Sequence, residues 1–365
     1  MKSLGFVRST VAVAAVAVIV GACSSGSASP AASAASSSAT GASSATGASY
    51  TIGVSNTLQG NGWREAMICS IKAQALASGR VSSLTIDHRN TDAAGQLSDI
   101  RDLIAKGVKA IIVNPVSPDA VNAALKEAMD KGIVVVAVDM GVTQAGAYLM
   151  ANDQLNYGYL GAKWLFTQLN GKGNVIYMGG IAGASADTDR ATGFKKALAE
   201  FPGIKVAKEV ATGWDNAKAV QQISDILSSG IPFDGIWTSG QDNVIVDALK
   251  TAGHAYVPIV GADNAGFVKQ LLTENGLKGA AVTNPASVGG AGLALAIKIL
   301  DGQKPSDPKV LVTTAVWDNT TEAGKASLTA ANDPAIDATW PLGIQIPDWT
   351  TYTKAQILAC KGPGE

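Results

Sequence analysis

From Tyr50 onward, short apolar runs alternate with stretches of helical period, and this alternation constrains the fold more than any other feature. Ile133–Val138 is continuously apolar, and so is the run that ends at Val113. Strands buried on both faces have this character. Between the two runs, 118–131 has a helical pattern and is followed by Gly132, the residue type common just past a helix end. Such alternation predicts parallel sheets covered by helices on both faces.

The alternation comes in two series, one ending near Ala151 and the other running from Leu155 to Leu300. A chain of 365 residues is long enough for two domains. The sequence therefore predicts an α/β fold with two doubly wound parallel-sheet lobes. A ligand is expected in the interlobe cleft, because domain interfaces and the carboxyl ends of parallel strands are both preferred binding places.

The first residues have the features of an export signal. Lys2 and Arg8 precede the apolar run Val11–Val20, which is too short to span a bilayer comfortably. The small residues before Cys23 resemble the bacterial lipobox. This resemblance predicts a lipoprotein signal peptide over 1–22, with cleavage before Cys23 and lipid on that cysteine. A plain secretory signal with a free cysteine is the alternative.

The next segment, 23–49, is predicted to be the lipidated cysteine followed by a disordered tether. After Cys23 it consists almost entirely of Ser, Ala, Gly and Thr, which cannot bury a core. A flexible chain of about 26 residues reaches roughly 25–30 Å. The tether would hold a soluble domain near a membrane partner.

Composition argues against several function classes. The net charge is −1, which disfavours a nucleic-acid partner that needs a basic face. The two histidines, His88 and His254, and the three cysteines have no metal-ligand spacing. We expect neither a metal nor a cofactor.

Gly179–Phe194 combines an apolar run, a turn of small residues and a helical pattern that contains Arg190. Arg190 is expected in the first helical turn, at the carboxyl end of a strand. Because a helix dipole disfavours a cation there, Arg190 should have a partner or a ligand. The glycines of Gly179–Gly183 partly imitate a dinucleotide fingerprint but lack its full spacing. Nucleotide binding and a solvated surface Arg190 are the alternatives.

Four motifs occur in order along the chain: Ile112–Pro115, Val138-Asp139, Gly180–Ser185 with Arg190 and Gly193-Phe194, and Val260–Asp263. Together they resemble the type 1 periplasmic substrate-binding proteins of sugar ABC transporters, in the ribose-binding group. The resemblance runs from about Tyr50 to about Val312. It implies a non-enzymatic, monomeric, extracytoplasmic receptor that delivers a monosaccharide or polyol to an ABC permease. With the lipobox, the expected location is lipid-anchored at the cell membrane.

The resemblance also implies how the lobes are joined. Crossings are expected near Asn152-Asp153, near Thr283–Pro285 and near Thr313–Ala315, which form a multi-crossover hinge that closes on the ligand. The lobes would then comprise 50–152 plus 285–312, and 153–284. The remaining 313–365 would be the hinge return and a C-terminal tail packed on the body.

Ligand-binding residues are carried over from the family by position. Aromatic rings suit the faces of a sugar, and Asp, Asn, Gln and Arg offer donors and acceptors for hydroxyls. Met140 stands where the family has an arginine, and Arg64 is the suggested replacement. Core packing is the alternative for Trp63 and Trp214, and helix capping for Asp139 and Asp263. The residues are Asn61, Trp63, Arg64, Asp139, Arg190, Trp214, Gln241, Asp263, and Thr283 or Asn284, a register left open.

The segment Val316–Glu365 extends beyond the usual end of the family. Its aromatic residues are too many for a disordered tail, so it should lie against the body. If Cys23 carries lipid, Cys69 and Cys360 remain as a pair in an oxidising compartment. We predict a disulfide that pins the tail to the first helix and contributes roughly 4–5 kcal/mol in the chain-entropy model. Two buried free cysteines are the alternative.

Two further functions stay open on the sequence alone. The same fold could present ligand to a membrane signalling receptor, and the tether permits this. A secreted sugar hydrolase would need two carboxylates facing one glycosidic bond. Asp139 and Asp263 are the candidates for such a pair. Product formed from a glycoside would favour the enzyme, and tight binding of unchanged sugar would favour the receptor.

Overall fold

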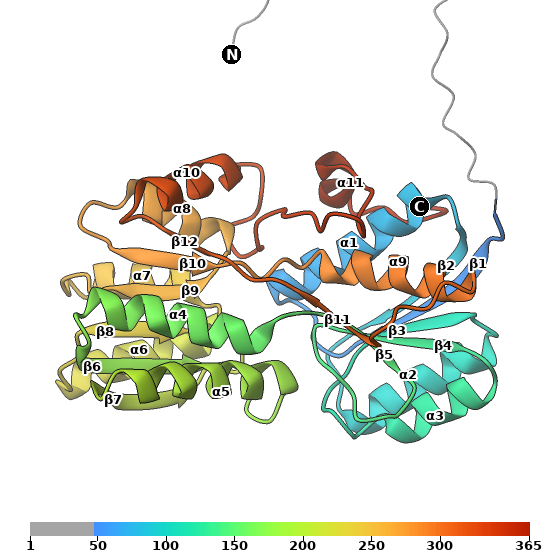
Figure 1. Ribbon diagram of the computed structural model, residues 1–365, viewed down its shortest axis with the longest axis horizontal. Coiled ribbons are helices and arrows are strands. Elements are labelled where there is room, and N and C mark those ends of the chain that lie inside the picture. The colour runs from blue at the N-terminus through green and yellow to red at the C-terminus, as the bar shows by residue number, and fades with distance from the viewer. Residues whose placement is uncertain (1–46) are drawn as a thin grey trace, which may run out of the picture. The chain divides into compact units, whose positions relative to one another are not determined.

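The computed structural model describes residues 47–365, and these fold into two lobes (Figure 1). The predicted signal peptide, Cys23 and most of the predicted tether lie outside the described residues. Within the described part, no helix is long and apolar enough to cross a membrane.

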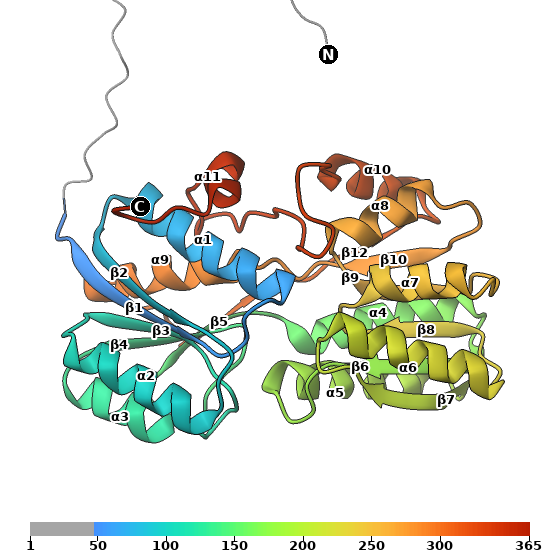
Figure 2. The same cartoon turned by 180° about the vertical axis from the view of Figure 1, so that it is seen from behind.

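The first lobe is built on a parallel sheet with the strand order β11-β5-β4-β3-β1-β2. Helices α1 and α9 cover one face and α2 and α3 the other (Figures 1 and 2). Its elements are β1 Tyr50–Asn56, α1 Gly62–Ser78, β2 Val81–His88, α2 Ala93–Ala105, β3 Ala110–Asn114, α3 Asn122–Asp130, β4 Val134–Val138, β5 Tyr148–Asn152, α9 Val288–Leu300 and β11 Lys309–Val312.

The second lobe repeats this plan with the strand order β12-β10-β9-β8-β6-β7. Only β12 is antiparallel to its neighbour. Helices α4 and α5 cover one face, and α6, α7 and α8 the other. Its elements are α4 Gln154–Gln168, β6 Lys172–Gly179, α5 Ser185–Glu200, β7 Gly203–Ala211, α6 Asn216–Ser229, β8 Gly235–Thr238, α7 Asp242–Thr251, β9 Ile259–Ala262, α8 Ala265–Thr273, β10 Gly279–Val282 and β12 Val316–Asp318.

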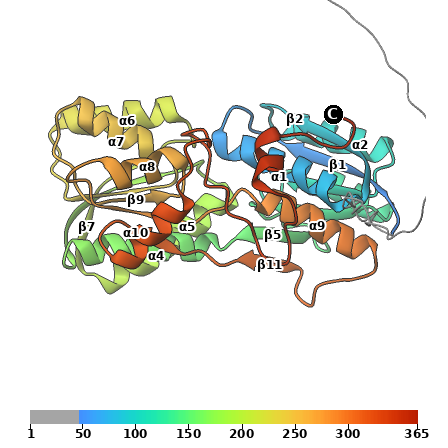
Figure 3. The same cartoon turned by 90° about the horizontal axis from the view of Figure 1, so that it is seen from above.

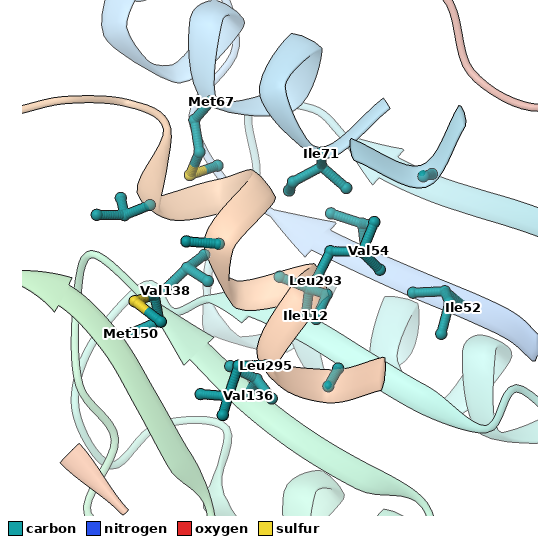
Figure 4. Close-up of a cluster of buried hydrophobic side chains, with 14 of the residues drawn as sticks. Ile52, Val54, Met67, Ile71, Ile112, Val136, Val138, Met150, Leu293 and Leu295 are labelled. Atoms are coloured by element: carbon teal, nitrogen blue, oxygen red, sulfur yellow. The ribbon is translucent and has the colours of Figure 1, made fainter. Parts of the chain in front are cut away.

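The core of the first lobe explains why α1 is fixed against the sheet (Figure 4). Ile52 and Val54 of β1 point to the same face, where they meet Met67 and Ile71 of α1. All four side chains are at most 1% exposed. Burying an aliphatic side chain contributes about 1.5–3 kcal/mol, so α1 is firmly held and its first residues stay at the carboxyl end of β1.

The two-lobed parallel fold predicted from the sequence is confirmed. The chain passes between the lobes from β5 to α4, from β10 to α9 and from β11 to β12.

The tail adds a fourth passage. Helix α10, Glu322–Ala331, packs on the second lobe, and α11, Lys354–Ala359, packs against α1 of the first (Figure 3). The predicted disulfide is confirmed as well, because Cys360, which caps α11, is bonded to Cys69 of α1 with their Cα atoms 4.5 Å apart.

Candidate functional site

A cavity of about 370 Å³ lies between the lobes. Small-molecule sites typically measure about 300–1,000 Å³, so its volume suits a ligand of monosaccharide size. The residues expected from the sequence to bind ligand gather in its lining, with the exception of Thr283. Those in the lining are Asn61, Trp63, Arg64, Asp139, Arg190, Trp214, Gln241, Asp263 and Asn284.

The N-cap and the first turn of α1 bring the side chains of Asn61 and Trp63 to the cavity. The Asn61 side chain caps α1 by accepting the Arg64 amide at 3.2 Å, as Asn does at helix N-termini. Its Nδ2 donates to the Trp214 carbonyl at 3.0 Å, which joins the two lobes. Trp63 Nε1 donates to the Asn284 carbonyl at 2.7 Å while its ring packs on the first-lobe core. Asn61 and Trp63 therefore have structural bonds as well as a place in the lining.

Arg64 and Asp139 form the charged part of the first-lobe wall, and both are buried. Arg64 Nη1 donates to Asn56 Oδ1 at 2.6 Å. Burial lowers the pKa of Arg64, and the charge of Asp139 opposes that shift. Burial likewise raises the pKa of Asp139, while the charges of Arg64 and Arg190 lower it. The opposite charges of Arg64 and Asp139 therefore each oppose the pKa shift that burial causes in the other group.

The backbone of Asp139 is in the left-handed region, at φ 63°. This conformation is uncommon for a residue other than glycine and often marks a functional site. The next residue, Met140, is absent from the cavity lining and packs in a small apolar cluster with Ala184 and Ala186 of the second lobe. At the position where the family resemblance implied a basic ligand, this chain has an apolar contact between lobes.

Arg190 lies in the second turn of α5, and not in the first, because the helix begins at Ser185 instead of after the whole small-residue turn. Its side chain is 3% exposed, so it is not a solvated surface group. Nε donates to Gln154 Oε1 at 2.7 Å, and Nη1 donates to the carbonyl and hydroxyl oxygens of Ser239 at 2.9 and 3.0 Å. The guanidinium carbon lies 4.1 Å from the centre of the Tyr157 ring. These bonded partners are all neutral, while the positive charge of Arg190 lowers the pKa of the nearby Asp139, Asp242 and Asp263.

Gln154 links several residues of the site and was not predicted from the sequence. It opens α4 directly after the passage from β5, and it is 4% exposed. Besides accepting from Arg190, its Nε2 donates to Asp139 Oδ1 at 3.1 Å and to Asn284 Oδ1 at 3.2 Å. One side chain thus connects the first lobe, the second lobe and a crossing segment. The only signal in the sequence was a polar residue next to an expected crossing.

Two aspartates of the second lobe have opposite surroundings. Asp242 accepts hydrogen bonds from Thr238 Oγ1, from the Ala262 amide at 3.0 Å and from Asn264 Nδ2 at 2.6 Å. The carboxylate of Asp263 is fully buried, and no side chain among residues 47–365 donates to either of its oxygens. Burial raises the pKa of each aspartate to about 7, and the backbone amides of Asn284 and of Asp263 itself oppose this rise at Asp263. Asp263 is therefore an acceptor in the cavity wall without a side-chain donor, which is the situation that a hydroxyl-bearing ligand would resolve.

Trp214 and Gln241 complete the second-lobe wall. Trp214 Nε1 donates to the carbonyl and hydroxyl oxygens of Ser239, both at 3.1 Å, and its backbone is left-handed at φ 53°. Gln241 Oε1 accepts from Thr212 Oγ1 at 3.1 Å. Ser239, which holds both Trp214 and Arg190, also lies in the lining and was not predicted.

Thr283 and Asn284, the two candidates left open by the sequence, have different positions relative to the cavity. The Thr283 hydroxyl accepts the Ala315 amide at 2.8 Å and so joins two crossing segments, while Asn284 lies in the lining. Thr339 and Pro341 of the tail also line the cavity. The sequence predicted that the tail would lie against the body, but nothing in it pointed to these two positions.

The chain matches the sequence model of a family described as "Periplasmic binding protein domain" over residues 52–304. The tail from Val316 onward lies outside this match.

Among individual proteins, the chain is 31% identical to the xylitol-binding protein of Mycolicibacterium smegmatis, covering 62% of this chain and 66% of that protein, slightly under two thirds. It is 27% identical to the ribose import binding protein RbsB of Escherichia coli, covering 63% of this chain and 79% of that protein. A solved structure of the periplasmic binding protein of the arabinose ABC transporter from Shewanella sp. ANA-3, bound to L-arabinofuranose, has a TM-score of 0.71 at 26% identity, covering 77% of this chain and 95% of that one.

Proposed function

The chain belongs to the periplasmic binding protein domain family, and on this premise we propose that it is an extracytoplasmic receptor for a sugar or polyol. It captures its ligand in the cavity between the lobes and delivers it to the permease of an ABC importer. The names of its relatives support this class of ligand, since they include proteins that bind xylitol, ribose and arabinose.

The observation that carries the proposal is the buried Asp263 carboxylate without a side-chain donor, in a cavity that also holds two arginines and two tryptophans. Ligand hydroxyls can donate to Asp263 and accept from Arg64 and Arg190. The apolar ring surfaces of Trp63 and Trp214 suit the faces of a sugar. Since charge-assisted hydrogen bonds are about twice as strong as neutral ones, a neutral polyhydroxyl ligand can bind tightly here.

In this proposal the lobes close around the ligand. Two hydrogen bonds between the lobes support a closed arrangement, one from Asn61 Nδ2 to the Trp214 carbonyl and one from the Gly141 amide to Ser185 Oγ at 3.1 Å. Gln154 adds a third link, because it bonds to groups of both lobes. The closed, liganded form is what the permease would recognise.

The proposal includes attachment to the membrane and a non-catalytic role. Lipid on Cys23 and the tether that follows would keep a monomeric receptor within reach of its permease. Asp139 and Asp263 act as hydrogen-bonding groups that hold an unchanged sugar, and a glycoside incubated with the protein is expected to remain intact.

A ligand screen tests the function directly. The purified protein would be heated with pentoses, pentitols, hexoses and inositols, with amino acids and nucleosides as controls. A ligand at 100 times its dissociation constant stabilises the folded state by about 2.7 kcal/mol, which shifts the melting temperature measurably. A shift with one class of sugar or polyol is expected. Shifts only with amino acids or nucleosides would contradict the proposal.

A further inference from the structure

The tail from Thr320 to Cys360 is attached to both lobes, and each attachment is specific. On the second lobe, the Ala265 amide donates to the Trp340 carbonyl at 2.8 Å and the Gly266 amide to the Ala338 carbonyl at 2.9 Å. The Leu342 amide donates back to the Asp263 carbonyl at 2.8 Å. Residues 337–342 thus extend the second lobe at the start of α8, next to Asp263.

On the first lobe the tail is held by packing, by hydrogen bonds and by the disulfide. Ile346 is buried in the first-lobe core, and Tyr352 packs beside Cys69. The Thr351 amide donates to Gln74 Oε1 of α1 at 2.9 Å. The Cys69–Cys360 bond then fixes the far end. The tail therefore changes from one lobe to the other between Leu342, which is in the second-lobe core, and Ile346.

The part held on the second lobe also forms a wall of the cavity. Pro341 is buried, pairs in a β-bridge with Asn264 and faces the cavity, as does Thr339. Trp340, between them, packs against the cores of both lobes. The wall also meets α1 closely, because a Cβ added to Gly62 would collide with the carbonyl and hydroxyl oxygens of Thr339.

We propose that residues 337–342 are a specificity-determining wall of the sugar cavity, which rests on the function proposed above. Pro341 and Thr339 limit the size of the ligand on the side where α1 and α8 begin. The hydrogen bonds to α8 keep this wall on the second lobe, and the disulfide-anchored return to α1 keeps it in place when the cavity is empty. We expect a pentitol, the ligand size suggested by the name of the xylitol-binding relative, to fit better than a longer polyol.

Two variants are designed to change the wall. Pro341→Ala shortens its apolar side chain. Gly266→Ala, outside the cavity lining, would place a Cβ 2.8 Å from the Ala338 carbonyl oxygen and push the segment away. Gly343→Ala is the matched control, because its Cβ would meet only Ile336 Cδ1 at an ordinary 3.7 Å in the same segment.

The measurement is the dissociation constant of xylitol and of sorbitol for each variant by titration calorimetry. We expect the preference for xylitol over sorbitol to fall about tenfold in Pro341→Ala and Gly266→Ala, since one methylene changes discrimination by about 10–200-fold. Gly343→Ala should keep it. An unchanged preference in all three folded variants would overturn the proposal, and Pro341→Ala decides alone if Gly266→Ala does not fold.

A measurement on the empty protein distinguishes an error in the proposed wall from an error in the proposed function. If the unaltered protein binds neither polyol, that ligand class is wrong, and hydrogen exchange in the empty protein decides on the wall. The amides of Ala265, Gly266 and Leu342 should be protected, and less so in the Cys69→Ser, Cys360→Ser double variant. Fast exchange of these amides in the unaltered protein would mean that the segment is not a fixed wall.

Discussion

Asp139 and Asp263 are buried carboxylates of the cavity lining, one from each lobe, and they differ in how far other side chains satisfy them. Asp139 of the first lobe accepts a hydrogen bond from Gln154 and lies in the field of Arg64 and Arg190. Asp263 of the second lobe is more completely buried and has no side-chain hydrogen-bond donor among the described residues. On the proposed function both carboxylates meet the sugar, but Asp139 also stabilises the wall of the empty cavity, whereas Asp263 depends more on the ligand for donors.

The largest expected effect is on binding in Asp263→Asn. Loss of the charged acceptor should weaken binding of the sugar found in the screen by about 100-fold, since hydrogen bonds to charged groups contribute about 1.5–3 kcal/mol each. Stability of the empty protein should not decrease, because no internal partner is lost. Calorimetry would measure the affinity, with the exposed Asp225→Asn as control. Binding unchanged from the control would show that Asp263 does not meet the ligand.

Asp139→Asn should have its main effect on the stability of the empty protein, whereas Asp263→Asn mainly affects sugar binding. The amide can keep a bond to Gln154, but the buried Arg64 loses the charge that opposes its burial. We expect a loss of about 2 kcal/mol in the free energy of unfolding, below the cost of breaking a directly bonded buried ion pair. Urea denaturation of the empty protein measures it. Equal stability of the Asp139→Asn and Asp263→Asn variants would remove the distinction between the two carboxylates.

The stability of the empty protein should also depend on pH through Asp263. Burial raises the pKa of Asp263 to about 7 in the folded protein against an ordinary 3.8, and the charge of Asp242 adds to the rise, while the backbone amides of Asn284 and Asp263 and the charge of Arg190 oppose it. Between these values the folded state binds more protons than the unfolded state, so this group makes the empty protein less stable as pH rises from about 4 to about 7.

Binding should change in the opposite direction, because hydroxyls donate to the ionised carboxylate. Affinity is expected to fall about tenfold for each pH unit below 7. Titrations between pH 5 and 8 would show this, and the dependence should flatten in Asp263→Asn. A slope that persists in that variant would assign the titration to another group.

The smallest expected effect is that of Gln154→Leu. Gln154 lies outside the cavity lining but links Asp139, Arg190 and Asn284. Without these bonds the closed arrangement should be less stable, and binding should weaken about fivefold, equivalent to about one ordinary hydrogen bond. Stopped-flow fluorescence should place the change mainly in the dissociation rate. A normal dissociation rate would mean that Gln154 does not stabilise closure.

The fold could be predicted because buried parallel strands leave continuous apolar runs such as Ile133–Val138, which depend only on local sequence. Much of the cavity lining followed from a family resemblance carried by short motifs. What could not be predicted depends on partners brought together by folding. Gln154 is an ordinary polar residue until Asp139 and Arg190 lie beside it. Met140 could be identified as a departure from the family, but its contact with the second lobe required the fold.

The tail was the least predictable region for the same reason. Its aromatic residues indicated that it would be buried, and cysteine counting indicated where it would end. Neither could indicate that Pro341 would reach the cavity, because that depends on hydrogen bonds between two backbone segments. Backbone bonds such as that from Leu342 to Asp263 leave little trace in side-chain composition.

The disulfide also has a consequence for the order in which the protein is made. Cys69 is synthesised 291 residues before its partner, an interval of roughly 15–60 s at about 5–20 residues per second. During this time it is a free thiol in the first helix, and both sheets are translated before its partner exists. The disulfide can form only after this interval and then closes a loop that spans most of the binding domain, so that a truncated or stalled chain lacking Cys360 stays without this bond and is chemically distinguishable from a finished one.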